Sequence, residues 1–150
     1  MKDNHIATAK GLDLGISTKF SIEICNYIKG KSVKQAKQIL EEVLMKKTAI
    51  PLKRFNKDRG HKKGEIASGA YPQKASAAIL KLIKSAESNA NNIGLNTESL
   101  YIKNILANRA SSPMRHGRQR RISAKRTHVD IILEEKEPKK TKEEKKATKK

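Results

Sequence analysis

The chain has 150 residues, which is most simply a single domain, and a domain of this size can bury a substantial core. Its 34 Lys and Arg residues against 15 Asp and Glu residues give a formal charge of +19, which favours a polyanionic partner: nucleic acid, an anionic membrane face or an acidic protein. A single cysteine excludes an internal disulfide and fits a reducing compartment. No apolar run approaches the roughly 20 residues of a membrane span. Residues 1–10 carry no apolar segment of a signal peptide, so we expect a cytoplasmic protein.

The N-terminal part of the chain predicts a short strand followed by a helix. Residues 4–15 alternate loosely between apolar and polar positions, as in a strand. Ser17 or Thr18 can serve as the N-cap of a helix that ends at Gly30. Cys25 lies among the isoleucines of this helix, which favours a buried small side chain over a reactive thiol.

Two further helices are predicted from apolar residues at helical spacing. Ser32 and Gln35 read as a capping box, and the apolar stripe that follows continues to Leu44. Pro72 suits the first turn of the third helix, whose apolar face ends at Gly94. Between these two helices, residues 46–71 break the pattern and form a long connection, of the length that is usually functional or disordered.

Three amphipathic helices need a surface to cover, and the alternating residues near 100–103 and 128–133 predict strands that supply it. We therefore expect an α+β fold in which a small antiparallel sheet of about three strands packs against three helices. The expected organisation is one domain over residues 1–135, with a basic insertion loop at 46–71, a long protruding arginine-rich β-hairpin at about 104–128, and a disordered Lys/Glu-rich tail at 136–150.

No set of residues in this sequence resembles an active site. The four histidines are scattered, and none has a Cys or His neighbour at metal-ligand spacing. The glycines of residues 60–69 lack the order of a phosphate-binding loop. Five of the acidic residues lie between 134 and 144, where burial would not shift their pKa. We expect no enzyme activity, no metal and no cofactor.

The basic residues, in contrast, are concentrated in two segments. The first segment contains Lys46, Lys47, Lys53, Arg54, Lys57, Arg59, Lys62 and Lys63. The second segment contains Arg109, Arg115, Arg118, Arg120, Arg121, Lys125 and Arg126. The second is mostly arginine, which can hold a phosphate bidentately and stack on a base. Gly117 lies among these arginines and would allow close approach of the backbone to a ligand.

Charge runs are commonly plain solvated surface, and we accept that reading for the tail. For residues 109–126 it is disfavoured, because two neighbouring strands with seven like charges and no Asp or Glu would repel each other without a partner. No predicted helix carries the basic groups, so structured RNA is favoured over sequence-specific reading of DNA. Phe55 in the first segment is either a stacking platform for a base or a residue that packs the loop onto the domain.

Several sequence words resemble the twenty-second family of large-subunit ribosomal proteins, whose eukaryotic members carry the number seventeen. These words are IKGKSVKQAKQIL (28–40), IPLKRFNKDRGH (50–61), YPQKASAAILKLIKSAESNANNIGL (71–95), LYIKNI (100–105), RHGR (115–118) and VDIILEE (129–135). The resemblance covers residues 5 to about 135. The long insertion before YPQKAS is similar to the archaeal and eukaryotic branch of the family.

This resemblance implies a structural protein that binds large-subunit ribosomal RNA through its core and its hairpin. In the family, the hairpin passes through the RNA to the wall of the nascent-peptide exit tunnel, near the constriction also formed by the fourth large-subunit protein. The family's hairpin motif matches Arg115, Gly117 and Arg118, which implies that these residues pack against RNA. The later basic residues would lie on the returning strand. Only NRASSP precedes RHGR, where family members usually have a longer tip, so we expect a shorter hairpin. The tunnel-facing tip candidates are Pro113, Met114, Arg115 and His116.

Three hypotheses about function follow. The first is a ribosomal scaffold protein in the cytoplasm, with large-subunit RNA, neighbouring ribosomal proteins and the nascent polypeptide as partners, which supports subunit assembly and translation. The second is a free RNA-binding regulator or RNA chaperone that is not stably bound to ribosomes. The third, an enzyme that acts on RNA, needs an acid/base pair that we do not find.

Overall fold

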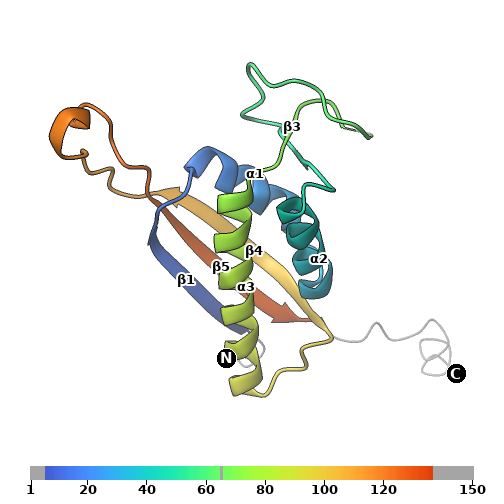
Figure 1. Ribbon diagram of the computed structural model, residues 1–150. Helices are drawn as coiled ribbons and strands as arrows, with labels where there is room; N and C mark the ends of the chain where they lie inside the picture. The colour runs from blue at the N-terminus through green and yellow to red at the C-terminus, as the bar shows by residue number, and fades with distance from the viewer. Residues whose placement is uncertain (1–5, 65, 137–150) are drawn as a thin grey trace, which may run out of the picture.

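The computed structural model describes residues 6–64 and 66–136, and it has the predicted α+β fold (Figure 1). Three helices cover one face of a three-stranded antiparallel sheet, and a second, two-stranded ribbon lies in the connection between the second and third helices. The elements in chain order are β1 (Ile6–Leu14), α1 (Thr18–Ile28), α2 (Val33–Leu44), β2 (Ile50–Pro51), β3 (Gly69–Ala70), α3 (Gln73–Ile93), β4 (Leu100–Arg109), the 3-10 helix η1 (Gly117–Gln119) and β5 (Thr127–Glu135). None of the helices in these residues is long and apolar enough to cross a lipid bilayer.

The main sheet has the strand order β1-β5-β4, so its last strand in sequence lies in the middle. Both pairings are antiparallel, from Ile6 opposite Glu134 in one pair and from Leu100 opposite Glu135 in the other. Alternate residues of β5 are buried, as expected for a strand with one face toward a core. Helix α3 packs over β1 and β5, and α1 packs over β4 (Figure 1).

The ends of the helices confirm the local signals in the sequence. The backbone N–H of Gln35 donates to Ser32 Oγ at 3.3 Å, which is the N-cap half of the predicted capping box. Gly30 and Gly94 follow α1 and α3 with φ angles of +78° and +86°, a region that glycine enters without steric cost. Helix α3 begins at Gln73, so Pro72 caps the helix instead of lying in its first turn.

The core is a single aliphatic cluster between the helices and the sheet. Ile79 and Ile83 of α3 are fully buried against Ile131 and Leu133 of β5 and the surrounding residues of this cluster. Each such side chain contributes roughly 1.5–3 kcal/mol by leaving water. Cys25 is buried in the same cluster, as predicted, and burial raises the pKa of its thiol to about 12.

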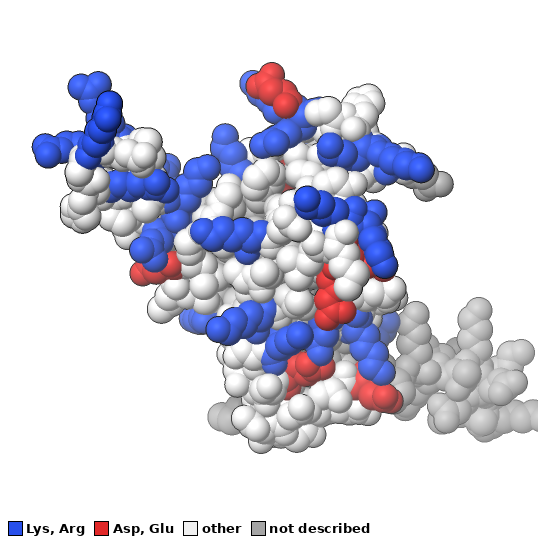
Figure 2. All heavy atoms as spheres, viewed as in Figure 1, with Lys and Arg blue, Asp and Glu red and all other residues white. Residues whose placement is uncertain are grey.

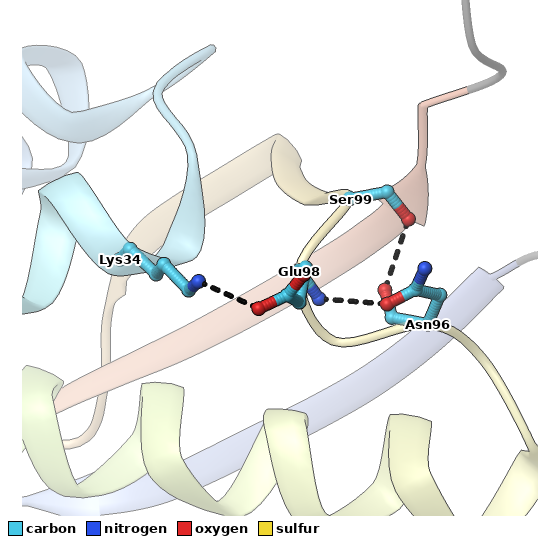
Figure 3. A network of polar contacts seen from close by, with 4 residues as sticks. All are labelled: Lys34, Asn96, Glu98 and Ser99. Atoms are coloured by element: carbon cyan, nitrogen blue, oxygen red, sulfur yellow. Dashed lines mark hydrogen bonds and ion pairs between the residues drawn. The ribbon is translucent and has the colours of Figure 1, made fainter.

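A set of polar contacts holds the end of the sheet at which β4 begins. Lys34 at the start of α2 donates to Glu98 at 3.1 Å, and the backbone N–H of Glu98 donates to the Asn96 side chain at 3.0 Å (Figure 3). The Ser99 hydroxyl donates to the Asn96 carbonyl oxygen at 3.0 Å. These contacts fix the turn between α3 and β4, at the end opposite the protruding segment of residues 109–126 (Figure 1).

The structure adds detail to two segments that the sequence outlines only coarsely. Regular pairing of β4 with β5 ends at Arg109 opposite Thr127, so the strands do not extend through the whole protrusion. The connection at 46–71 is not without secondary structure, because β2 and β3 pair within it. The predicted tail falls outside the described residues, except for Lys136.

Candidate nucleic-acid interface

The protrusion, which we call the basic arm (residues 109–126), is an irregular antiparallel ribbon that projects from the sheet (Figure 1). Three backbone hydrogen bonds join its outgoing and returning sides: Ala110 N–H to Arg126 O at 3.1 Å, Ala124 N–H to Pro113 O at 2.8 Å, and Arg115 N–H to Ile122 O at 3.0 Å. Proline has no N–H to give to a ladder, which accounts for the loss of regular strand pairing near Pro113.

The arm closes at its far end through η1 and the turn after it. Gly117 begins η1 with a φ of +71°, a value that a residue with a Cβ rarely adopts. Arg120 and Arg121 lie in this closing turn, so only Lys125 and Arg126 of the later basic residues lie on the returning side. Pro113 and Met114 lie on the outgoing side before the turn. Arg115 pairs with Ile122 at its start, and His116 directly precedes η1.

The basic side chains of the arm face solvent, and acidic groups do not neutralise them. Six of the seven are exposed and Arg126 is half-buried. Among the residues that the structure describes, none of the seven takes part in an ion pair. Arg115 donates to the Gln119 side-chain oxygen at 3.3 Å, and Arg126 donates to the Asp13 carbonyl oxygen at 2.9 Å.

The base of the arm is fastened to the turn between β1 and α1. Thr127 is fully buried, and its hydroxyl donates to the Ile16 carbonyl oxygen at 3.1 Å. The hydroxyl oxygen of Thr18 lies 2.9 Å from the hydroxyl oxygen of Thr127. The next residue, His128, accepts from the Asp13 backbone N–H at 3.2 Å through Nδ1. These contacts set the direction in which the arm leaves the sheet.

The first basic segment lies in the basic loop (residues 46–71), and its basic side chains also face solvent. Seven of its eight predicted basic side chains are exposed, and Lys62 is half-buried with its Nζ 5.9 Å from the centre of the Tyr71 ring. Arg59 lies over the Phe20 ring of α1 at 5.3 Å. Cations over aromatic faces attract the ring electrons, so these pairs hold the loop against the domain.

Phe55 packs the loop onto the domain. Its ring is half-buried, with Arg54 at 5.3 Å and Lys19 of α1 at 5.7 Å from its centre. Because two cations already lie over it, the structure favours packing of Phe55 over a free stacking platform. Lys19 was not among the predicted site residues, although its position beside Phe20 at the start of a helix was visible in the sequence.

A groove lies between the arm and the starts of two helices. Lys74 of α3 and Arg115, Lys125 and Arg126 of the arm line it, and no described lining residue is acidic. The helices α1 and α3 both begin at this groove, and neither has a side-chain cap on its first N–H groups. Helix N-termini carry partial positive charge, so the groove is electropositive from backbone and side chains together. The sequence pattern did not single out Lys74.

The contact that holds the middle of the basic loop was also missed. Glu23 of α1 is only 2% exposed, and its carboxylate accepts the backbone N–H groups of three consecutive residues. The donor–acceptor distances are 3.3 Å for Lys53, 2.8 Å for Arg54 and 2.7 Å for Phe55. The available signal was an acidic residue between two isoleucines, Ile22 and Ile24, since carboxylates are rarely buried without partners.

The basic arm and the basic loop project from the same end of the molecule (Figure 2). Figure 2 shows lysine and arginine side chains over both projections. Within residues 6–64 and 66–136, no group of three His, Cys, Asp or Glu side chains could hold a metal ion. Fold and surface together define a small α+β protein with an electropositive end suited to a polyanion.

Comparisons with known proteins give the family. Residues 9–134 match the family of ribosomal protein L22p/L17e. The large ribosomal subunit protein uL22 of Methanosphaera stadtmanae is 43% identical over 141 residues, which cover 89% of this chain and 91% of that protein. The uL22 proteins of Methanococcoides burtonii and Methanococcus aeolicus are 40% and 41% identical, over 86% and 88% of this chain and 89% and 91% of their own lengths. The chain therefore belongs to the ribosomal protein L22p/L17e family, in its archaeal form.

Family membership confirms the resemblance noted in the sequence. It also confirms the prediction that this chain is not an enzyme, because the family consists of ribosomal structural proteins. The sequence words that carried the resemblance extend over α2, β2, α3, β4, the start of η1 and β5, and they include the Glu134–Glu135 end of the central strand.

Proposed function

We propose that this chain is a structural component of the large ribosomal subunit that binds large-subunit ribosomal RNA through its basic arm and basic loop. Its place in the cell is then the ribosome in the cytoplasm, and neighbouring ribosomal proteins are further partners. The names of its archaeal relatives, which are large ribosomal subunit proteins, support this assignment.

The observation that carries the proposal is the unbalanced charge at one end of the molecule. The arm presents seven basic side chains that form no ion pair among the described residues, and the groove at its base adds Lys74 and two helix starts. RNA phosphates would neutralise these groups and release their counterions, with about 0.7–0.9 units of log–log salt slope for each phosphate. The proposed RNA contacts are therefore the predicted basic residues of both segments together with Gly117.

The arm is the part of this chain that we propose to reach the wall of the nascent-peptide exit tunnel. Its length beyond the sheet and its exposed closing turn support this role (Figure 1). The tip that faces the tunnel would then consist of the turn around η1 together with the neighbouring Arg115 and His116. Pro113 and Met114, on the outgoing side, would lie deeper in the RNA.

The direct test is a density map of large subunits from the source cell, traced at side-chain resolution around the exit tunnel. We expect residues 109–126 to run between RNA helices to the tunnel wall. Absence of the chain from subunits washed in high salt would refute the ribosomal assignment and favour the free RNA-binding regulator or chaperone. An arm that is folded back on the protein surface, away from RNA, would refute its role alone.

A further inference from the structure

A carboxylate that lies beneath the basic loop has a geometry that a general electrostatic attraction to RNA does not explain. Glu23 is 2% exposed, and removing an ionised carboxylate from water costs several kcal/mol unless partners replace the water. Its partners are the backbone N–H groups of Lys53, Arg54 and Phe55. In the described residues it forms no ion pair with any lysine or arginine.

The arrangement of the three hydrogen bonds determines the path of the loop. One oxygen, Oε1, accepts from Arg54 at 2.8 Å and from Phe55 at 2.7 Å, and the other, Oε2, accepts from Lys53 at 3.3 Å. Three successive N–H groups that converge on one anion turn the backbone around it, as in an anion-binding nest. Here the anion is supplied by the protein's own helix, so the loop backbone is held without an external ligand.

The side chains of the same three residues differ in their exposure to solvent. Lys53 and Arg54 are exposed, whereas Phe55 is half-buried and lies under Arg54 and Lys19. The contact with Glu23 therefore determines where two cations of the proposed RNA-binding surface stand. A negative charge inside a basic surface should weaken attraction to phosphate by Coulomb's law, yet this charge fixes the cations that would bind the phosphate.

We propose that Glu23 is a positioning residue for RNA binding: its carboxylate shapes residues 53–55 so that Lys53 and Arg54 meet the RNA backbone together. This inference rests on the proposed RNA-binding function. It makes a prediction opposite in sign to simple electrostatics, because removing the negative charge of Glu23 weakens binding to a polyanion instead of strengthening it.

The test compares Glu23→Gln with Asp58→Asn, which removes a negative charge from the same loop. Asp58 is exposed, makes no side-chain hydrogen bond or ion pair with the other described residues, and has a φ of +56°, a conformation that asparagine adopts readily. In Glu23→Gln the amide oxygen can still accept from Arg54 and Phe55, but the amide nitrogen faces the Lys53 N–H and cannot accept from it. Both variants have the same net charge, so any difference in their Kd for RNA reflects the position at which the negative charge was removed.

The probe is an in vitro transcript of the source organism's large-subunit ribosomal RNA, and Kd is measured against salt concentration with the full chain. For Glu23→Gln we expect Kd to rise about tenfold, and the salt slope to fall by roughly 0.7–1.8 units as one or two phosphate contacts are lost. For Asp58→Asn we expect equal or tighter binding with an unchanged slope. A purely structural role for Glu23 would lower the melting temperature and leave the slope of the folded protein unchanged.

Equal or tighter binding by Glu23→Gln, with the wild-type slope, overturns the positioning role. If Glu23→Gln does not fold, Glu23→Asp replaces it, since the shorter carboxylate keeps the charge but cannot reach all three amides; binding equal to wild type then overturns the proposal. Failure of the proposed function itself is seen differently. In that case the wild-type chain would not bind the transcript in a salt-dependent way, whatever stands at position 23.

Discussion

Replacing Thr127 by valine tests the fastening at the base of the arm. Valine has nearly the same shape as threonine, so the substitution removes the hydroxyl and little else. In the native protein this hydroxyl donates to the Ile16 carbonyl oxygen at 3.1 Å and lies 2.9 Å from the Thr18 hydroxyl. Since the Thr127 proton is given to Ile16, the Thr18 hydroxyl is the donor in the second bond. Both bonds are therefore lost together.

The expected loss of stability follows from these two bonds. A typical intramolecular hydrogen bond contributes about 0.5–1.5 kcal/mol net, so two contribute about 1–3 kcal/mol. Thr127 is fully buried, so no water replaces its hydroxyl, whereas the half-buried Thr18 can turn partly toward solvent. Valine also favours a strand slightly more, which offsets a few tenths of a kcal/mol. We expect the free energy of unfolding to fall by about 1–2 kcal/mol.

The assay is urea unfolding at neutral pH, supported by the melting temperature. Each kcal/mol corresponds to roughly 2–8 °C for domains near this size. The matched control is Thr8→Val, which makes the same change on the exposed face of β1, and there we expect a change within about 0.5 kcal/mol. If Thr127→Val unfolds at the same urea concentration as Thr8→Val, the fastening contributes nothing and our reasoning about the arm's base is wrong.

Three further predictions concern the arm, the core and the tail. Replacing Arg115 and Arg118 together by Glu should prevent stable incorporation into large subunits, measured by cofractionation, while the melting temperature of the isolated protein stays near wild type; normal incorporation would contradict the arm's role. Because burial raises the pKa of the Cys25 thiol to about 12, a thiol reagent at pH 8 should modify it only after unfolding. As pH rises above about 8.5 the unfolded thiol ionises while the folded thiol does not, so stability should fall by up to roughly 1.4 kcal/mol per pH unit, a slope that Cys25→Ala lacks. We also propose that the domain ends near residue 135, so deleting residues 138–150 should leave the melting temperature unchanged, and a large decrease would contradict that boundary.

The sequence predicted the elements whose signal is local. The helices follow from apolar residues at helical spacing and from caps such as Ser32 and Gly94. Each of these signals lies within the helix that it predicts or directly beside it. The alternation in β5 likewise needs only its own residues, and one buried face explains it. Side-chain periodicity reports which face is buried, and this was enough to predict the layers of the fold.

The features that sequence reasoning missed depend on contacts between distant segments. The partners of Glu23 are backbone N–H groups 30 to 32 residues away, and every residue except proline has such a group, so no residue pattern marks them. The two-residue strands β2 and β3 are too short to show a period. The end of regular pairing in the arm did have a local signal, because Pro113 is unfavourable inside a paired strand.

The central position of β5 has a consequence for how a newly made chain reaches its native state. The strand that joins β1 to β4 is the last to be synthesised of those described, and its partner β1 is separated from it by nearly the whole chain, as with Ile6 opposite Glu134. Until β5 is available, β1 and β4 have no neighbour in the sheet, and pairings this distant in sequence form slowly. The arm is also complete before its base can be fastened by Thr127. Each new copy therefore passes through an interval in which exposed strand edges and a free cationic segment coexist, a state open to aggregation and to capture by any RNA nearby.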